Sequence, residues 1–203
     1  MYKSFIKRGL DIFLSLFAII LLALPMLIVA VVIKIDDPGP AIFKQKRVGK
    51  DKKLFKLYKF RSMKMNTPEL PTHLLKNPEQ YISKVGKFIR KTSIDELPQL
   101  FNILIGQMSI IGPRPALWTQ ADLIAERDQY GANDIRPGLT GWAQINGRDE
   151  LDIETKARLD GEYAEKLSFA FDLKCFFGTV KAVLKSEGVV EGEVEKKEEV
   201  VRK

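Results

Sequence analysis

An uncharged apolar run from Ile12 to Ile33 constrains this chain more than any other feature of its sequence. Its 22 residues are enough to form a membrane helix, and a soluble core helix of this length would be unusually apolar on every face. The run is too long for the core of a cleavable signal peptide, and no small-residue cleavage site follows it. We therefore expect a membrane segment in this part of the chain.

Pro25 interrupts this run, because proline removes a backbone donor and clashes with the preceding helical turn. A helix broken there has arms of roughly 20 and 13 Å, and neither crosses a hydrocarbon core of about 30 Å. Three basic residues precede the run, and eleven basic against three acidic residues lie between Lys34 and Lys64. Since the positive-inside rule places both ends in the cytoplasm, a re-entrant helix-break-helix is favoured over a bitopic span.

Charge and composition narrow the classes of partner. The chain has 203 residues, 45% of them hydrophobic, which suits one domain with a real core, and its net charge is +7. Nucleic acid, anionic lipid and phosphorylated small molecules all fit that charge. No nucleic-acid-binding module accompanies it, whereas a polybasic strip beside a membrane segment attracts anionic lipid. A single cysteine and a single histidine exclude an intramolecular disulfide and a Cys/His zinc cluster within one chain.

The periodicity of the remaining sequence predicts an α+β fold, mostly helical, with a small β-hairpin at Ala41–Val48 and Leu54–Phe60. Predicted helices span Glu79–Lys91, Leu97–Leu104, Ala116–Gln129, Leu151–Leu167 and Ser168–Lys185. The last has an apolar stripe that suits either an amphipathic helix in the head-group plane or a helix packed on the core. We expect a membrane hairpin at 1–36, a catalytic domain on the cytosolic face at 37–186, and a mobile charged tail at 187–203.

Two adjacent carboxylates, Asp95 and Glu96, stand just ahead of a predicted short helix. A carboxylate can attack an electrophilic phosphorus or glycosidic carbon, and a second one beside it can orient it, share a metal or move a proton. The alternative is a capping box, in which the Ser93 hydroxyl and the Glu96 carboxylate satisfy the first amides of the helix. The pair alone does not separate these interpretations.

Several arginines are candidates for binding an anion. Arg90 directly precedes the carboxylate stretch, and Arg114 is held between two prolines that restrict its backbone. A second turn-rich stretch adds Arg136 and Arg148, and its Pro137-Gly138 pair fits the centre of a type II turn. In the same stretch, Trp142 either stacks on a base or sugar, packs in the core, or lies at a membrane interface.

Taken in order, these motifs closely resemble those of the bacterial sugar transferases, the monotopic phosphoglycosyl transferases, over about residues 1–185. The matching motifs are Lys7-Arg8-x-x-Asp11, Asp37-Pro38-Gly39-Pro40, Phe43-x-Gln45-x-Arg47-x-Gly49, Lys59-Phe60-Arg61-Ser62-Met63, Asp95-Glu96-Leu97-Pro98-Gln99, Gly112-Pro113-Arg114-Pro115 and Arg136 to Trp142. The compact chain is most similar to the small PglC-type members, which begin bacterial protein glycosylation. It departs at Ala23-Leu24-Pro25, where some relatives place a serine directly before the proline.

The resemblance implies transfer of a phospho-sugar from a UDP-sugar, such as an N-acetylated amino sugar, to undecaprenyl phosphate with release of UMP. It implies Asp95 as the nucleophile of a phosphosugar-aspartyl intermediate, Mg²⁺ as cofactor, and Glu96 as a metal-binding or positioning residue. It also implies a re-entrant hairpin with its bend at Pro25, at the cytoplasmic face of the bacterial inner membrane, where other glycan-pathway enzymes are possible partners. Arg90, Arg114, Arg136 and Arg148 are then candidates for the substrate phosphates.

Two other functions fit parts of the sequence. A non-catalytic basic scaffold needs only the membrane segment and the positive charge, and has no use for Asp95. A glycosyltransferase that releases UDP differs from a phosphosugar transferase in its nucleotide product. The identity of that product separates these possibilities.

Overall fold

The computed structural model describes residues 2–67, 77–147 and 150–185. Its helices are α1 (Lys7–Asp36), α2 (Lys84–Lys91), α3 (Gln99–Leu104), α4 (Ala121–Asp128), α5 (Trp142–Ile145), α6 (Ile153–Lys166) and α7 (Phe169–Lys185). Its strands are β1 (Ile42–Val48), β2 (Leu54–Phe60), β3 (Ser109–Ile111) and β4 (Gly138–Thr140). The expectation of a mostly helical fold with a small β-hairpin is confirmed, and the tail at 187–203 lies outside the described residues.

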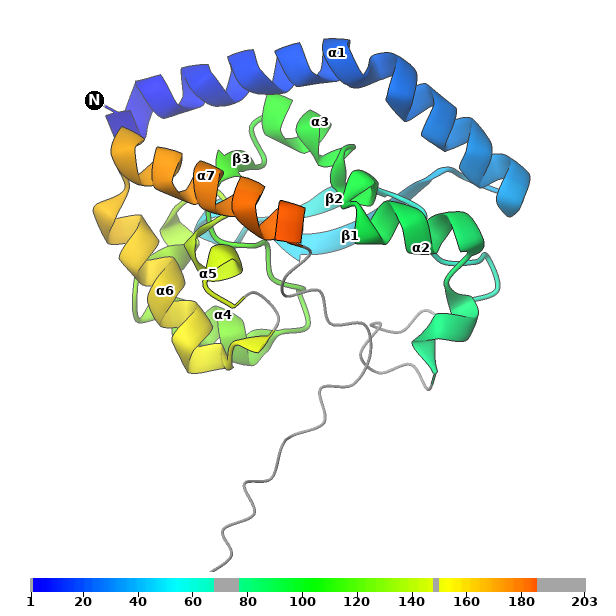
Figure 1. Cartoon of the computed structure of the whole chain (residues 1–203). Coiled ribbons are helices and arrows are strands. Elements are labelled where there is room, and N and C mark those ends of the chain that lie inside the picture. The colour runs from blue at the N-terminus through cyan, green and yellow to red at the C-terminus, as the bar shows by residue number, and fades with distance from the viewer. Residues whose placement is uncertain (1, 68–76, 148–149, 186–203) are drawn as a thin grey trace, which may run out of the picture.

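The membrane segment forms one helix, α1, which arches over the other elements (Figure 1). The predicted break at Pro25 is wrong, because helical structure runs without interruption from Lys7 to Asp36. Proline costs a helix one hydrogen bond and causes a steric clash, and a long helix can absorb both by bending. By length and composition α1 could cross a membrane, and it is the one such helix among the described residues.

Polar contacts hold the first turns of α1 on the body of the protein. The Arg8 guanidinium donates to the carbonyls of Ile103 and Leu104, the last two residues of α3, at 2.7 and 2.8 Å. Asp11, which is buried, accepts hydrogen bonds from the Ser109 hydroxyl at 3.0 Å and from the Ile110 amide at 2.9 Å. The Lys7-Arg8-x-x-Asp11 motif therefore attaches α1 to α3 and β3.

A buried network adds α7 to this attachment. Asp172 of α7 accepts hydrogen bonds from the Tyr2 hydroxyl at 2.5 Å, the Lys7 ammonium at 2.7 Å and the Tyr163 hydroxyl at 2.6 Å. Tyr163 also donates to the Ile111 carbonyl at 3.0 Å. The N-terminal end of α1 consequently lies beside α7, as Figure 1 shows.

The other end of α1 is held as well. Arg61, just after β2, binds the Asp37 carboxylate at 3.1 Å and also donates to the Asp37 carbonyl. The Asp37 carboxylate accepts the Met65 amide at 2.9 Å, and Asp36 accepts the Val85 amide at 3.4 Å. Both ends of a 30-residue helix therefore return to the same body.

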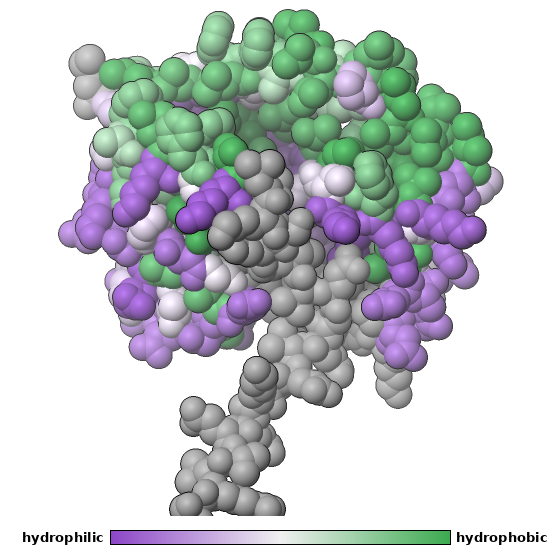
Figure 2. All heavy atoms as spheres, in the orientation of Figure 1, coloured by the Kyte–Doolittle hydropathy of each residue, from purple (hydrophilic) through white to green (hydrophobic). Residues whose placement is uncertain are grey.

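Apolar side chains gather over α1 and the elements beside it, while charged side chains lie below them (Figure 2). Between its ends α1 buries Ser15, Met26 and Ile33, and most of its large apolar side chains are exposed. Helix α7 buries Cys175 and Asp172 on one side and exposes Phe176 and Phe177 on the other. One face of α7 thus packs on the core, and the apolar side chains of another face are exposed.

The hairpin has its predicted position, and its inner face supports the core. Strands β1 and β2 pair antiparallel from Ile42↔Phe60 to Val48↔Leu54. Phe55 and Leu57 of β2 pack with Ile103 of α3 in one apolar cluster. Asn102 of α3 extends the attachment, since its side chain accepts the Tyr58 amide at 3.0 Å and donates to the Lys56 carbonyl at 2.8 Å. Strand β2 and helix α3 are therefore fixed relative to each other.

Strands β3 and β4 form a small parallel pair, with Ser109↔Gly138 and Ile111↔Thr140 in register. The apolar run at Met108–Ile111 predicts β3, whereas neither β4 nor its pairing with β3 was predicted. The predicted type II turn at Pro137-Gly138 is wrong, because Gly138 begins β4 and does not have the positive φ of a type II turn. A glycine is still required, since a Cβ there would lie 2.1 Å from the Gly112 amide nitrogen. Because Gly112 and Gly138 approach so closely, the turn that carries Arg114 lies against the stretch that carries Arg136.

Helix α2 is shorter than predicted. Its Ser83 N-cap accepts the Gly86 amide at 2.9 Å, so the helix begins at Lys84, and a separate 3₁₀ turn occupies Pro78–Tyr81. Helix α4 likewise begins at Ala121, later than the predicted Ala116. Both differences lie at helix starts, where local capping decides the boundary.

Gly86 offers a test of this packing, because the helix lies against the chain after β2. A Cβ at Gly86 would lie 1.9 Å from the Ser62 carbonyl oxygen, whereas one at Gly9 in α1 would have no neighbour within 4 Å. Alanine normally stabilises a helix interior by about 1 kcal/mol relative to glycine. We expect Gly86→Ala to destabilise the protein by about 1–3 kcal/mol through overpacking, measured by thermal unfolding in detergent. Gly9→Ala is the control and should be neutral or slightly stabilising; equal effects of the two substitutions would contradict this packing.

Candidate functional site

Asp95 and Glu96 lie in a single 3₁₀ turn, Ile94–Glu96, between α2 and α3. Ser93 enters this turn in the left-handed region at φ 56°, and within the described structure its hydroxyl makes no capping hydrogen bond. The capping-box interpretation is therefore wrong. Ile94 and Leu97 pack into the apolar cluster beneath α1, so the two carboxylates lie on a different side of the turn.

Cations surround the carboxylate pair. The Lys59 Nζ lies 2.8 Å from Glu96 Oε1 and 3.8 Å from Asp95 Oδ2. The Arg114 guanidinium donates to the same Glu96 oxygen at 3.1 Å. Three segments that are distant in sequence, β2, the turn before α3 and the proline turn after β3, thus meet at one point. Glu96 connects Lys59 and Arg114, while the Asp95 carboxylate makes the longer of the two contacts with Lys59.

Burial raises the pKa of the Asp95 carboxyl above its ordinary value, because a charge in this position loses hydration. Lys59 opposes that shift most strongly, Glu96 adds to it by like-charge repulsion, and Arg90 and Arg114 lower the pKa again. A poorly hydrated carboxylate surrounded by cations is a better nucleophile than a solvated one, and raised reactivity of this kind is common at catalytic sites.

The predicted anion-binding residues separate into two groups. Arg90 and Arg114 both act on Asp95. The Arg136 guanidinium instead donates to the Gly106 carbonyl at 3.0 Å, beyond the opposite end of α3 from Asp95. Arg148 lies outside the described residues.

Trp142 lies in a separate packed cluster. Its indole donates to Glu162 at 2.9 Å, its ring centroid is 5.0 Å from that of Phe171, and the Lys174 ammonium is 4.4 Å from the indole centroid. These contacts correspond to the packing interpretation of this tryptophan. Its contact with a nucleotide or sugar remains a prediction.

Lys59 is the site residue that the sequence reasoning did not select, although it belongs to a quoted motif. The available signal was the alternation of β2, in which Lys59 shares a face with the buried Phe55 and Leu57. A lysine at an inward position of a strand needs a carboxylate partner. That pattern could have identified Lys59, but it could not have identified Asp95 and Glu96 as its partners.

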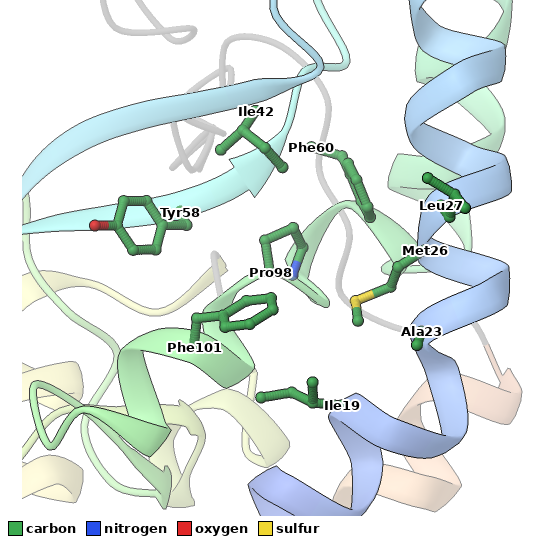
Figure 3. Close-up of a pocket in the computed structure, with 9 residues that line it drawn as sticks. All are labelled: Ile19, Ala23, Met26, Leu27, Ile42, Tyr58, Phe60, Pro98 and Phe101. Carbon is green, nitrogen blue, oxygen red and sulfur yellow. The ribbon is translucent and has the colours of Figure 1, made fainter.

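Two cavities lie next to the carboxylate pair. One is an apolar groove of about 360 Å³ bounded by α1, the hairpin and α3, and one of its walls is Pro98, three residues after Asp95 (Figure 3). The other is a polar cavity of about 200 Å³ whose wall includes Arg114, together with Arg47, Lys156 and Gln144. Arg114 therefore connects the carboxylates to the polar cavity.

The carboxylate pair fits the magnesium ion that the resemblance implies. Asp95 and Glu96 supply hard oxygen ligands, and no set of three acidic, histidine or cysteine side chains suited to a metal occurs among the described residues. Mg²⁺ is commonly bound by one or two carboxylates together with the phosphates of a substrate, and it keeps several waters. The site is therefore compatible with a metal shared with a phosphorylated ligand rather than enclosed by protein.

Comparison with known proteins gives a consistent result. A family model described as "Bacterial sugar transferase" matches residues 2–186. Over 91% of its length the chain is 40% identical to the UDP-N-acetylgalactosamine-undecaprenyl-phosphate N-acetylgalactosaminephosphotransferase of Aeromonas hydrophila. Over 86% it is 41% identical to the UDP-glucose:undecaprenyl-phosphate glucose-1-phosphate transferase of Escherichia coli (strain K12). It covers 45% and 39% of those two proteins, but 90% of the uncharacterized sugar transferase EpsL of Bacillus subtilis (strain 168), with 41% identity.

The raised pKa of Asp95 predicts an effect on stability. Asp95 stays protonated to a higher pH in the folded state than in the unfolded chain. Protonation of Asp95 therefore stabilises the fold, and this stabilisation is lost as the pH rises through the raised pKa. We expect Asp95→Asn to raise the melting temperature at pH 7, with the difference shrinking as the pH falls toward the ordinary aspartate value of 3.8.

Asp152→Asn is a matched control for this measurement. Asp152 is the exposed N-cap of α6, and the hydrogen bond from the Thr155 amide lowers its pKa, so its ionised form favours the fold. Its replacement should leave the melting temperature at pH 7 unchanged or lower it. A lower melting temperature for Asp95→Asn at pH 7 would contradict the assignment of a destabilising buried charge.

Proposed function

The chain belongs to the bacterial sugar transferase family, and we propose that it is a phosphoglycosyl transferase that moves a phospho-sugar from a UDP-sugar to undecaprenyl phosphate, releasing UMP. One observation carries the proposal: the buried carboxylate of Asp95 lies among Lys59, Arg90 and Arg114, Arg114 also lines a polar cavity, and Pro98, three residues after Asp95, lines an apolar groove. A reaction that joins a lipid phosphate to a nucleotide sugar needs a reactive group between two such environments.

In the first step, a carboxylate oxygen of Asp95 attacks the sugar-linked phosphorus of the donor. A bond forms between Asp95 and that phosphorus, and the bond from the phosphorus to the bridging oxygen breaks, so UMP departs with the bonding electrons. Asp95 suits this role because it is less firmly paired than Glu96, whose Oε1 contacts both Lys59 and Arg114. The product is a phosphosugar-aspartyl intermediate.

In the second step, a phosphate oxygen of undecaprenyl phosphate attacks the same phosphorus. The bond between Asp95 and phosphorus breaks, the carboxylate is regenerated, and the polyprenyl diphospho-sugar is released. Both half-reactions take place beside the same cation cluster. The cluster can therefore stabilise charge on the transferring phosphoryl group in each of the two steps. With in-line displacement in both steps, the acceptor phosphate attacks from the side that UMP has left.

The cations have separate parts in this proposal. Lys59 holds Glu96 and favours the ionised form of Asp95, since its charge opposes the rise in the pKa of that carboxyl. Arg114 lies at the boundary of the polar cavity and is placed to bind a donor phosphate. Arg90 adds positive charge near Asp95. When bound at Asp95 and Glu96, Mg²⁺ would supply further neutralisation of the donor diphosphate.

We place the protein monotopically at the cytoplasmic face of the bacterial inner membrane, with α1 entering and leaving on one side. The support is that both ends of α1 are held by the same body, through Arg8 and Asp11 at one end and Asp37 at the other. A straight helix of 30 residues would separate its ends by about 45 Å and could not make both sets of contacts easily.

For the donor we propose an N-acetylated amino sugar, such as UDP-diNAc-bacillosamine, and for the pathway the first membrane step of glycoconjugate or protein-glycan assembly. The names of the relatives include both N-acetylgalactosamine and glucose at nearly equal identity, so the choice of sugar must be measured. Other enzymes of the same pathway are the expected partners.

The primary test is nucleotide release from a panel of UDP-sugars with undecaprenyl phosphate and Mg²⁺. We expect UMP from the wild type with at least one donor, and a loss of at least about 10³-fold in Asp95→Asn, because the nucleophile is removed. UDP as the product would indicate direct glycosyl transfer. Activity retained in Asp95→Asn, once deamidation is excluded, would overturn the nucleophile assignment, and a silent panel would favour a non-catalytic scaffold.

The covalent intermediate has a separate test, the exchange of labelled UMP into the UDP-sugar without any lipid acceptor. A covalent route allows this exchange, since the first step is reversible and needs only the donor. We expect exchange in the wild type and none in Asp95→Asn. Transfer to lipid without detectable exchange would indicate direct displacement by the lipid phosphate.

Lys59 predicts a change in pH dependence. Its ammonium lowers the pKa of Asp95, so Lys59→Met should raise that pKa and move the acidic limb of the kcat/KM profile to higher pH. The rate at neutral pH should also fall by about 10²–10³-fold, because a preorganised cation is lost. Lys52→Met, which removes an exposed ion pair with Asp128, is the control. A profile for Lys59→Met that falls in rate without moving would show that Lys59 does not set the ionisation of Asp95.

A further inference from the structure

The polar cavity carries an excess of positive charge. Its wall has four cations, Arg47, Arg114, Arg127 and Lys156, and Asp160 is the one acidic side chain among the described residues that line it. Asp160 is 1% exposed and accepts two hydrogen bonds from the Arg127 guanidinium, at 2.9 and 2.5 Å. That buried ion pair occupies the carboxylate of the wall, so the cavity as a whole favours an anionic ligand.

Hydrogen bonds hold two of these cations in fixed orientations. The Arg47 guanidinium donates to the Gln45 side-chain oxygen at 3.1 and 2.7 Å and to the Pro115 carbonyl at 2.9 Å. The Arg114 guanidinium donates to Glu96 at 3.1 Å, as part of the carboxylate site. Because these side chains are already ordered, a ligand that binds them costs less conformational entropy on association.

Lys156 lies in the first turn of α6 and lines the same cavity. It is partly buried, yet its ammonium forms no hydrogen bond or ion pair within the part of the chain that the structure describes. Burial raises the pKa of Asp160, and Lys156 opposes that rise less than Arg127 does, so the lysine acts on this carboxylate at longer range. An ammonium that is partly removed from water needs a counterion, and lysine is a common ligand of phosphate.

The size and position of the cavity indicate which anion it binds. A volume of about 200 Å³ is below the roughly 300 Å³ at which typical ligand pockets begin, so the cavity suits one part of a nucleotide sugar. Arg114 lies in its wall and also contacts Glu96, beside the Asp95 carboxylate that attacks the sugar-linked phosphorus. In a UDP-sugar the next charged group is the phosphate that carries uridine. That phosphate is the part of the donor that fits beyond Arg114.

We infer that Lys156, together with Arg47 and Arg114, binds the uridine-linked phosphate of the donor and stabilises UMP as it departs. This inference rests on the proposed function for the identity of the donor. When the bond between the sugar-linked phosphorus and the bridging oxygen breaks, the bonding electrons stay on that oxygen and add to the charge of UMP. A cation placed next to this phosphate lowers the energy of the departing group. In the reverse reaction the same residues hold UMP for attack on the aspartyl intermediate.

The binding test compares UMP with uridine, which lacks the phosphate. We expect Lys156→Met to weaken the binding of UMP to the whole chain in detergent about tenfold or more, because a charged contact to phosphate is lost. Isothermal titration calorimetry measures this affinity. Uridine binding, measured by competition with a labelled UDP-sugar, should stay within about twofold of wild type. Equal weakening of UMP and uridine would indicate an altered cavity rather than a lost phosphate contact, and would overturn the inference.

Further variants serve as controls. Lys166→Met removes another lysine of α6, one that is exposed and paired with Glu162 at 2.8 Å, and UMP binding should stay within about twofold of wild type. Lys156→Arg keeps the positive charge and should recover most of the UMP affinity that Lys156→Met loses. Lys156→Gln removes the charge but keeps a polar side chain, and it replaces Lys156→Met if that variant does not fold. A loss of UMP affinity as large in Lys166→Met as in Lys156→Met would contradict a specific contact.

The two substrate phosphates are distinguished by farnesyl phosphate, a short analogue of the lipid acceptor. Weakened binding of farnesyl phosphate with unchanged binding of UMP in Lys156→Met would assign this lysine to the acceptor phosphate and overturn the inference. The exchange of labelled UMP into the UDP-sugar, without lipid, should be about 10²-fold slower in Lys156→Met than in the wild type.

Failure of the proposed function would give a different result. If the wild type shows neither exchange nor transfer with any donor, the proposed function fails, whereas the comparison of UMP with uridine needs no turnover and still tests Lys156. A wild type that binds UMP no more tightly than uridine would then overturn the inference as well.

Discussion

The attachment of α1 at both of its ends is the constraint on which the rest of the structure depends. A helix as apolar as this one gains most of its free energy from leaving water, and the apolar packing of Met26 and Ile33 on the body is non-directional. Arg8, Asp11 and Asp37 supply that orientation through hydrogen bonds to α3, β3 and the segment after β2. Lys59, Asp95 and Arg114 lie in segments directly adjoining these elements, so the carboxylate pair has a fixed depth relative to the apolar surface.

The site itself combines opposing electrostatic effects. Burial destabilises the ionised form of Asp95, and the charges of Lys59, Arg90 and Arg114 restore part of that loss. Glu96 accepts the close ion pairs instead, so the cations remain ordered while Asp95 keeps a reactive lone pair. In this arrangement the adjacent carboxylates differ in role because their distances to Lys59 differ, although their sequence context is nearly the same.

The sequence predicted well the features that depend on local pattern. The length of α1 followed from an uncharged run, the hairpin from strand alternation, and the end of α3 from Gly106, which has a positive φ of 88°. The sequence did not predict which short segments pair when they are distant in the chain. Strands β3 and β4 have three residues each, which is too few for a periodic pattern to show that they pair. The break at Pro25 was mispredicted for a related reason. A proline in the sequence indicates that one helical hydrogen bond is lost, but it does not show whether neighbouring residues allow the helix to bend instead of breaking. Arg136 was grouped with Arg114 by its turn-rich context, yet it contacts the opposite end of α3 from Asp95.

The network around Asp172 joins the start of the chain to its last described helix, since Tyr2 and Lys7 meet Tyr163 and α7 through one buried carboxylate. Pulling α1 out of a bilayer would break this network together with the Asp11 contacts, and would remove the Tyr2 and Lys7 donors from the buried Asp172 carboxylate. Extraction and loss of tertiary structure are then one event. For a protein built in this way, we expect neither salt nor alkali to release a folded form from a membrane.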